Sequence, residues 1–223
     1  MNKLIQLNKK IIKCNKCRRL VAFRKKISKK KRKQYINETY WGKPVPGFGD
    51  PFAKILLVGL APAAHGATRT GRVFTGDRSA AFLYNCLFKS KLANQPTSEN
   101  KNDNLKLFNT YITLALKCVP PNDKPTSTEL NICYDYFNNE IKYLNNIKII
   151  VALGKIAFDA CYKFYKKNYK LNNTYKFIHG KKYSLPDNKY LIGCYHPSPR
   201  NVNTKIINTN KMVKLFKNVQ NLI

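Results

Sequence analysis

Four of the seven cysteines in this chain are spaced in a way that suits metal ligation. Two residues separate Cys14 from Cys17, so both thiolates can turn onto one ion or cluster. Cys118 and Cys133 come much later in the chain and are candidates for the other two ligands. A site made only of thiolates suits zinc and an iron–sulfur cluster about equally well.

The other three cysteines favour a plainer interpretation. Cys86, Cys161 and Cys194 lie in apolar runs, and a free cysteine often behaves as a small hydrophobic side chain. The same interpretation is open for the four spaced cysteines, although their spacing favours a metal. Between the two cysteine pairs lies a run rich in Gly and Arg, from Gly59 to Asp77, which is the second stretch with the residue types of a functional site.

Length and hydropathy indicate one intracellular domain. A chain of 223 residues is most simply a single domain with a full hydrophobic core, which we place at residues 1–223. It has no run of about 18 apolar residues for a membrane helix and no apolar signal peptide at its start. We therefore expect a cytoplasmic monomer, at the nucleoid if the source is a bacterium. Thiols stay reduced there, so metal ligation is favoured over disulfides.

The formal net charge of +31 predicts a polyanionic partner, and nucleic acid is the first candidate. Against this, 34 of the 42 basic residues are Lys, which a biased genome could produce without selection for binding. The densest basic run is Lys25–Lys33. It could be an arm that faces DNA, a localisation signal or a solvated segment, which is the commonest fate of such runs.

Alternating strands and helices must position these residues. Nearly continuous apolar segments, typical of buried parallel strands, occur at Lys54–Gly59, Tyr111–Leu116, Ile147–Leu153 and Tyr190–Cys194. Helices are predicted at Ser79–Lys89, Ser127–Asn145, Lys155–Lys166 and Asn208–Val219. Thr126 and Glu129 form a capping-box signature at the second helix. The alternation predicts a three-layer α/β/α sandwich with a short, mainly parallel central sheet.

In such sheets ligands bind beyond the carboxyl ends of the strands. Each informative motif follows a predicted strand: Gly59–Asp77, Lys117–Pro125, Gly154 and His196–Asn201. The polar stretches Lys91–Asn104 and Lys166–Lys176 are predicted to be surface insertions without chemistry.

These motifs resemble the uracil-DNA glycosylase superfamily, and within it most closely family 5, the type B iron–sulfur enzymes. The resemblance runs in order from Cys14 to about Asn203. The motifs that support it are Gly59-Leu-Ala-Pro-Ala63, His65-Gly66, Arg69-Thr-Gly-Arg72, Phe74-Thr-Gly-Asp77-Arg78-Ser79, Lys117-Cys-Val-Pro-Pro-Asn-Asp-Lys-Pro-Thr126 and His196-Pro-Ser-Pro-Arg-Asn201.

The resemblance implies a [4Fe–4S] cluster in place of zinc. Cys14, Cys17, Cys118 and Cys133 fall on the positions of the family's four ligands. The cluster's role would be structural, docking the amino-terminal cysteine-rich and basic segment 1–50 onto the 118–133 loop beside the DNA path. No redox step is needed to cut a glycosidic bond.

The resemblance also assigns catalytic residues. Cleavage of an N-glycosidic bond places positive charge on the sugar and negative charge on the leaving base, so an anion and a hydrogen-bond donor are needed. Asp77 would stabilise the sugar and orient water, His196 would donate to the base, and Asn122 would position water or substrate. The alternatives are a helix N-cap for Asp77, a loop histidine for His196 and a turn residue for Asn122.

The target nucleotide must be flipped out of the duplex. Phe74 is predicted to stack on the base, with Leu60 and Ala61 lining the pocket, although Phe74 could equally be core. The loop of Ser198, Pro199, Arg200 and Asn201 is predicted to enter the vacated stack or the minor groove, although Arg200 could be only a phosphate contact. Arg72 is a further candidate for a DNA contact.

Two positions predict broad specificity. In many uracil-specific relatives the first motif carries an acid or amide, and an Asn follows the second strand. Here Ala63 and Leu114 hold those positions. Without the amide, other bases should be rejected weakly. The resemblance therefore implies a broad glycosylase that excises uracil and other deaminated bases such as hypoxanthine, as the first step of base excision repair. The rivals are a strict family 4 uracil glycosylase and a non-catalytic iron–sulfur or zinc module that binds nucleic acid.

A departure from the family follows Asn201. The family usually continues there with a turn that contains Gly, whereas this chain has Val-Asn-Thr-Lys-Ile-Ile207.

Overall fold

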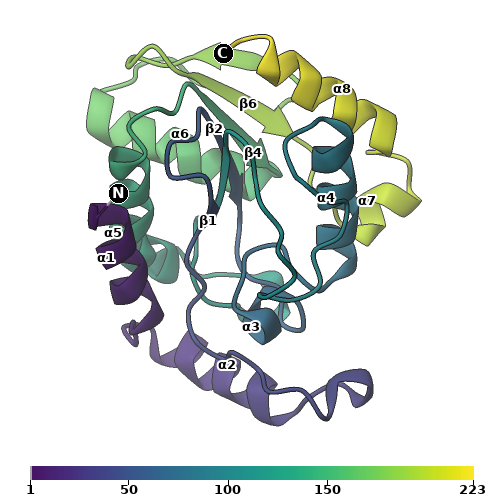
Figure 1. The fold of residues 1–223 in the computed structure, drawn as a ribbon. Helices are drawn as coiled ribbons and strands as arrows, with labels where there is room; N and C mark the ends of the chain where they lie inside the picture. Colours follow the sequence, from purple (N-terminus) through teal and green to yellow (C-terminus); the bar gives the residue numbers. More distant parts are fainter. Residues whose placement is uncertain (1) are drawn as a thin grey trace.

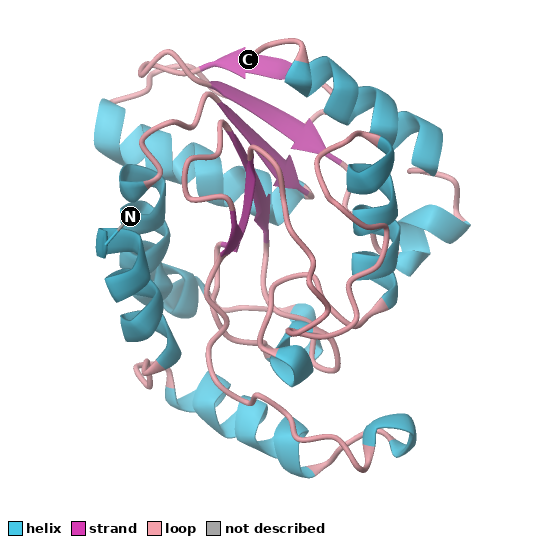
Figure 2. Cartoon of the chain, in the orientation of Figure 1, coloured by secondary structure: helices cyan, strands magenta, loops and turns pink. Residues whose placement is uncertain are grey.

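A six-stranded sheet lies between two layers of helices in the computed structural model, which describes residues 2–223 (Figure 1). The strand order is β1-β3-β2-β4-β6-β5. The inner strands are parallel, and both edge strands run antiparallel to their neighbours (Figure 2). The predicted three-layer α/β/α sandwich is therefore confirmed.

The four predicted strands form the centre of the sheet. They are β2 (Ile55–Gly59), β3 (Thr110–Leu114), β4 (Ile149–Leu153) and β6 (Tyr190–Cys194). Every residue of the first three is buried, because helices cover both faces of the sheet. The edge strands β1 (Phe48–Gly49) and β5 (Lys182–Ser184) are short and partly exposed, and they lack the apolar runs that revealed the others.

Helices α1 (Asn2–Ile12), α5 (Ser127–Tyr143) and α6 (Lys155–Tyr169) cover one face. Their apolar residues pack against Leu56 and Val58, the side chains of β2 that point to this side. The predicted capping box is present, with the Thr126 hydroxyl accepting from the Glu129 N–H and the Glu129 carboxylate accepting from the Thr126 N–H.

Helices α4 (Arg78–Lys89) and α8 (Thr209–Gln220) cover the opposite face (Figure 1). They pack against Ile55 and Leu57, which alternate with the β2 residues of the first face, as the two-residue period of a strand requires. The helix after β2 and the helix after β4 thus lie on different faces. This divergence opens a crevice at the carboxyl ends of β2 and β4.

The amino-terminal segment is helical, which the sequence did not predict. Helix α1 is followed by α2 (Arg18–Lys29) and a short 3-10 turn, η1 (Lys33–Tyr35). Only Leu20 and Arg24 are buried on α2, so its pattern is too polar to indicate a packed helix. The basic run Lys25–Lys33 extends over the end of α2 and into this turn.

Two shorter helices belong to the loops of the crevice: α3 (Ala67–Thr70) after β2 and α7 (Pro199–Asn203) after β6. After α7 the backbone turns through Lys205, whose φ of 57° is in the left-handed region. Lys205 therefore supplies the conformation for which a Gly is usually favoured.

Within residues 2–223, no helix is both long enough and apolar enough to span a lipid bilayer.

Candidate functional site

A cavity of about 450 Å³ lies at the carboxyl ends of the parallel strands, where the motifs converge. Loops after β2, β4 and β6 contribute to its wall, together with the end of β3. The predicted site residues that line it are Leu60, Ala61, Ala63, Phe74, Asp77, Leu114, His196, Ser198 and Pro199. Asp123 and Gly154 line it as well, so residues from all four motifs that follow the strands share one cavity.

Asp77 has two roles in the structure. It is the N-cap of α4, where its Oδ1 accepts a hydrogen bond from the Ala80 N–H at 2.9 Å, and it also lines the cavity. The N-cap alternative is thus realised without removing the carboxylate from the site. Burial raises the pKa of Asp77, and the N–H groups of Ala80 and Ser79 and the charge of Arg69 oppose that shift.

Gly66 makes room for this carboxylate. A Cβ at Gly66 would lie 1.9 Å from Asp77 Oδ2, which is far inside van der Waals contact. Arg69 links the two segments that carry Gly66 and Asp77. Its guanidinium donates hydrogen bonds to the carbonyls of His65 and Gly76, each at 2.8 Å. The position of Asp77 is therefore fixed by its neighbours in the motif as well as by its own cap.

His196 enters the cavity from the end of β6. Burial lowers its pKa, an effect that the charge of Asp123 partly opposes. The imidazole is therefore favoured in its neutral form, which can donate one hydrogen bond and accept another. Its backbone is held by Asn201, whose Nδ2 donates to the His196 carbonyl at 2.9 Å.

Phe74 is buried at the base of the cavity, with its ring centroid 6.0 Å from that of His196. Its φ of 46° is unusual for a residue with a large side chain, and such strain is typically retained where function requires it. Gly59 permits the packing, because a Cβ there would lie 2.8 Å from both Phe74 and Leu114.

The amino-terminal end of α6 also faces the cavity. Gly154, with a φ of 99°, is its N-cap and offers no side-chain cap, and the first helical residues, Lys155–Ala157, line the wall. The free N–H groups and the helix dipole give this end a partial positive charge. Negative charge that develops in the cavity is therefore stabilised there.

Asn122 differs from its expected placement. Its side chain is exposed and the residue is absent from the cavity wall, whereas the next residue, Asp123, lines the cavity. Both residues have left-handed backbone, with φ of 52° and 55°, which directs their side chains differently from those of an ordinary turn. Asp123 was not predicted from the sequence, although it is a carboxylate within the loop Lys117–Pro125, which was expected beside the site.

The placement of Arg72 contradicts the expected DNA contact. Its side chain is only 5% exposed and forms a two-pronged ion pair with Asp103, with N–O distances of 2.7 and 2.6 Å. It also donates to Thr75 and Ser98. The stretch Lys91–Asn104 is therefore more than the plain surface insertion expected, because it braces the loop that carries Phe74 and Asp77.

The loop after His196 is shaped by its own side chains. The Ser198 hydroxyl caps α7 by accepting from the Asn201 N–H at 3.3 Å. Pro199 is the first residue of that helix and lines the cavity, while Arg200 is exposed. Of these residues, Arg200 is the one whose side chain is most accessible to a phosphate.

The four spaced cysteines line a second, small cavity. Cys14 and Cys17 lie between α1 and α2, Cys118 follows β3, and Cys133 is on α5. Burial is the main cause that raises the pKa of Cys118 and Cys133 to about 12, and their neighbouring cysteines add to the shift. The structure thus brings together four thiols that are far apart in sequence.

The chemistry of this donor set, four thiols in one pocket, suits a thiolate-bound metal centre. Among residues 2–223, no group of three or more His, Cys, Asp or Glu side chains is close enough to hold one metal ion. Zinc would draw all four sulfurs to about 2.3 Å from one centre, whereas an iron–sulfur cluster spreads them around a larger cage. The wall is otherwise largely apolar, with Leu20, Leu116 and Tyr136 beside the sulfurs.

Comparison with known proteins agrees with the motifs. Residues 46–220 match the family model of the uracil DNA glycosylase superfamily. The type-5 uracil-DNA glycosylase of Thermus thermophilus is 44% identical over 191 residues, which cover 86% of this chain and 85% of that protein. Type-5 enzymes of Mycobacterium bovis and Pyrobaculum aerophilum are each 37% identical, over 98% and 93% of this chain and 81% and 88% of their own lengths.

These matches extend over almost the whole chain, including the strands and loops that form the cavity. The protein therefore belongs to the uracil-DNA glycosylase superfamily and, within it, to the type-5 family.

Proposed function

We propose that the protein is a monofunctional DNA glycosylase that hydrolyses the bond between deoxyribose and uracil in DNA and thereby starts base excision repair. The observation on which this depends is that Asp77, His196 and Phe74 share one cavity at the carboxyl ends of the strands. The anion and the hydrogen-bond donor serve the cleavage of the bond, and the aromatic ring can stack on the flipped base.

Asp77 is proposed to act on the sugar. As the bond between C1′ and the base nitrogen breaks, both bonding electrons leave with the base and the sugar becomes positively charged. The ionised carboxylate stabilises that charge and orients the water whose oxygen adds to C1′. The proton released by the water finally neutralises the base anion.

His196 is proposed to act on the leaving base. The neutral imidazole, favoured by burial, donates a hydrogen bond to the carbonyl oxygen where negative charge collects. The amino-terminal end of α6, on the same cavity, adds its dipole. Preorganised groups of this kind typically supply the largest part of the rate.

Asp123 and Asn122 share the proposed role of positioning substrate or water from the loop after β3. Asp123 is the nearer of the two to the cavity. Phe74 stacks on the flipped base, and the loop Ser198–Asn201 contacts the DNA that surrounds the vacated position. We assign Arg200 to a phosphate, while Ser198 and Asn201 shape the loop.

Specificity is proposed to be broad. Among the described residues that line the cavity there is no Asn or Gln. Leu114 holds the position where an Asn would read the base edge, and Ala63 the position where an acid or amide would hold water. Strong rejection of a wrong base requires a buried polar group such as that Asn. Hypoxanthine and other deaminated bases are therefore included in the proposal, in contrast with a strict family 4 enzyme.

Cys14, Cys17, Cys118 and Cys133 would hold a [4Fe–4S] cluster. When bound, the cluster supplies no step of the hydrolysis and acts as a structural link. The four residues tie the segment 1–50 to the loop after β3 and to α5, within a single domain that spans residues 1–223 and works as a monomer.

Incubation with duplexes that carry uracil or hypoxanthine, followed by alkaline cleavage at abasic sites, tests the proposal. Cleavage at both lesions is expected. Cleavage at uracil alone would support a strict uracil enzyme, and no cleavage at either lesion with DNA binding retained would support a non-catalytic binding module.

A further inference from the structure

The amino-terminal segment forms a basic arm, residues 18–40, that comprises α2, η1 and the chain up to Tyr40. Figure 1 shows α2 and η1 extending along one end of the molecule, below α3. Residues 18–37 contain no Asp or Glu. The exposed basic residues include Lys25, Lys29, Lys30, Arg32 and Lys33.

The arm is anchored to the loop that carries Asp77. The Tyr35 ring stacks on the Arg69 guanidinium at 3.9 Å, and Glu38 pairs with the same group. The Tyr40 hydroxyl is 2.9 Å from His65 Nδ1. Arg69 in turn donates to the carbonyl of Gly76. Contacts therefore run from the arm to the residue directly before Asp77.

A second anchor lies near the base of the arm. The buried Arg24 guanidinium donates to the Gly42 carbonyl at 2.8 Å and to the Cys14 carbonyl at 3.2 Å. One basic residue of the arm is thus used to hold α2 in place, while the neighbouring Lys25 and Lys26 remain exposed to solvent. The arm is therefore held to the rest of the protein near both of its ends, through Arg24 and through Tyr35 and Tyr40. This favours a fixed binding element over a merely solvated segment.

A groove of about 580 Å³ separates the end of the arm from the body of the protein. It is lined by Tyr35 and Glu38 of the arm, by Pro96–Asn100, and by Asp77 and Arg78 at the start of α4. Asp77 also lines the cavity of about 450 Å³ at the ends of the strands, which would hold the flipped base and is called the base cavity below. The groove therefore meets the base cavity at the catalytic carboxylate.

We propose that this groove and the basic arm hold the sugar–phosphate backbone next to the flipped nucleotide. This proposal rests on the proposed function, because it places the lesion strand across Asp77. Charge complementarity selects the occupant. Arg69 neutralises the carboxylate of Glu38, the other charged residues of the groove are Asp77, Arg78 and Glu99, and the flanking residues 18–37 carry basic side chains and no acid. The lesion strand would enter between the arm and the 96–100 loop.

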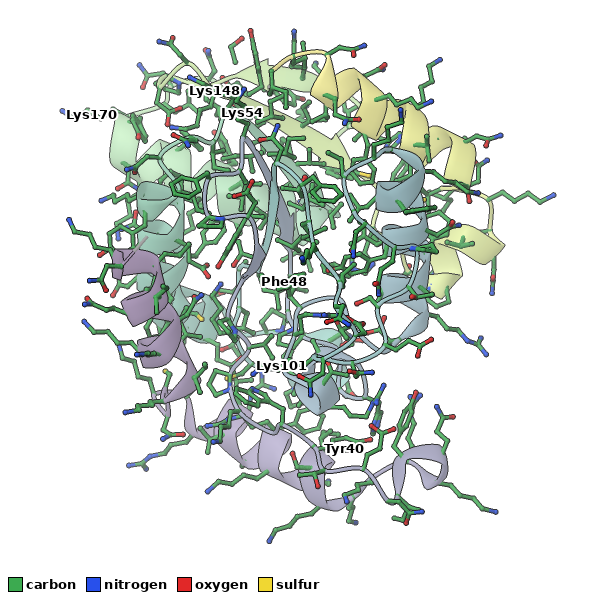
Figure 3. The ribbon with its side chains drawn as sticks, in the orientation of Figure 1. Tyr40, Phe48, Lys54, Lys101, Lys148 and Lys170 are labelled. Carbon is green, nitrogen blue, oxygen red and sulfur yellow. The ribbon has the colours of Figure 1, made fainter. Side chains whose placement is uncertain are left out.

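The test compares two variants with the same change of charge. The arm variant replaces Lys25, Lys29, Lys30, Arg32 and Lys33 with Gln. The control replaces five exposed lysines elsewhere, Lys142, Lys148, Lys166, Lys170 and Lys176, with Gln. Figure 3 shows two of these, Lys148 and Lys170, at the end of the molecule opposite the arm.

Affinity for an undamaged duplex is measured against salt. The arm variant should bind at least tenfold more weakly than wild type at about 100 mM salt, and its log–log salt slope should fall by about 2 to 3, as expected when a few phosphate contacts are lost. The control should stay within about threefold. Equal losses in the two variants, or none in either, would overturn the proposal.

A third variant tests the anchor. Tyr35→Ala leaves every charge in place but removes the ring that stacks on Arg69. It should weaken the affinity for DNA at least threefold while the thermal stability stays unchanged. An unchanged affinity would count against an arm that must be fixed in place. Because undamaged DNA is used, these measurements do not depend on excision. If the wild-type protein binds DNA through the arm but excises no base, the proposed function is refuted while the proposed role of the arm in binding DNA is retained.

Discussion

At the scale of single residues, Asp77 lines the cavity and also caps α4. Replacing its carboxylate with an amide separates the proposed catalytic role from the structural one. Asp77→Asn keeps the size and the cap of α4 but removes the anion. Single-turnover excision of uracil should slow by roughly a hundredfold or more, while affinity for uracil DNA stays near wild type. Stopped single-turnover assays with excess enzyme measure this directly.

The pH profile provides the control. Burial raises the pKa of Asp77, so wild-type excision should fall on the acid side at a pH above the ordinary carboxyl range of about 4. Asp77→Asn should lose that acid limb. The carboxyl group of Asp77 holds its proton more tightly in the folded protein than in the unfolded chain, so the ionisation of Asp77 lowers stability as the pH rises. Asp77→Asn has no such ionisation. It should therefore melt at the same temperature as wild type, or slightly higher, at neutral pH. An unchanged rate would place the catalytic anion elsewhere.

Specificity is also decided by a single residue in the proposal. Leu114→Asn would introduce an amide at the end of β3, on the cavity wall. The ratio of uracil to hypoxanthine excision should rise by about tenfold or more, because the larger purine ring would hold its carbonyl and N–H out of register with an amide placed to pair with uracil. Competition assays with both lesions measure the ratio. Leu114→Ala, which adds space without an amide, should not raise it.

At the scale of elements, the ion pair between Arg72 and Asp103 connects two loops that flank α4. Arg72→Met should destabilise the protein by about 3 kcal/mol, because it leaves a largely buried carboxylate without its partner. A loss of that size lowers the Tm by about 10 °C in a chain of this length. Asp159→Asn, which breaks the exposed pair with Lys155, should change stability by less than about 1 kcal/mol.

The same pair has a predictable pH dependence. Arg72 and nearby N–H groups lower the pKa of Asp103 to about 2, against the opposing effect of burial. The pair therefore contributes stability above about pH 4 and loses it as the pH falls toward 2. Thermal melts of Arg72→Met and wild type should converge over that range; a constant difference would mean that packing, and not charge, dominates.

The sequence predicted the elements whose patterns depend on burial. β2, β3, β4 and β6 were recognisable because each is apolar on both faces, and α5 because Thr126 and Glu129 cap it. α2 was missed, since it buries little beyond Leu20 and the polar Arg24. The edge strands have partners on one side only and carry no such signal.

The site could be predicted as a set of motifs but not as a geometry. Asp77 and His196 were identified through the resemblance, and the structure places both on one cavity. Asp123 was missed and Arg72 was wrongly given to DNA, because backbone conformation and a distant partner, Asp103, decide where those side chains lie. Local sequence does not contain that information.

At the scale of the whole molecule, the cysteine cavity should determine whether the amino-terminal segment docks. The purified protein should be brown, with absorption near about 400 nm, and Cys14→Ala should lose colour and stability together, because binding energy of a structural metal is partly folding energy. Cys161→Ala, on the buried side of α6, should keep the colour. A colourless protein with stoichiometric zinc would reject the cluster and retain the ligand set.

The overall charge leads to a second prediction at this scale. Affinity for undamaged duplex should fall by orders of magnitude between about 50 and 200 mM salt if several phosphates are contacted. Fluorescence anisotropy at a series of salt concentrations measures the slope. A flat dependence would mean that the excess of Lys reflects composition and not binding.

The double use of Asp77 has a practical consequence. The cap of α4 tolerates an amide, which also keeps the size of this side chain on the cavity wall. The cysteine cavity and the basic arm lie outside the change. Asp77→Asn should therefore give a stable protein that recognises uracil in DNA and releases it unbroken. Immobilised on a support, such a protein could enrich uracil-containing fragments from genomic DNA and so map cytosine deamination.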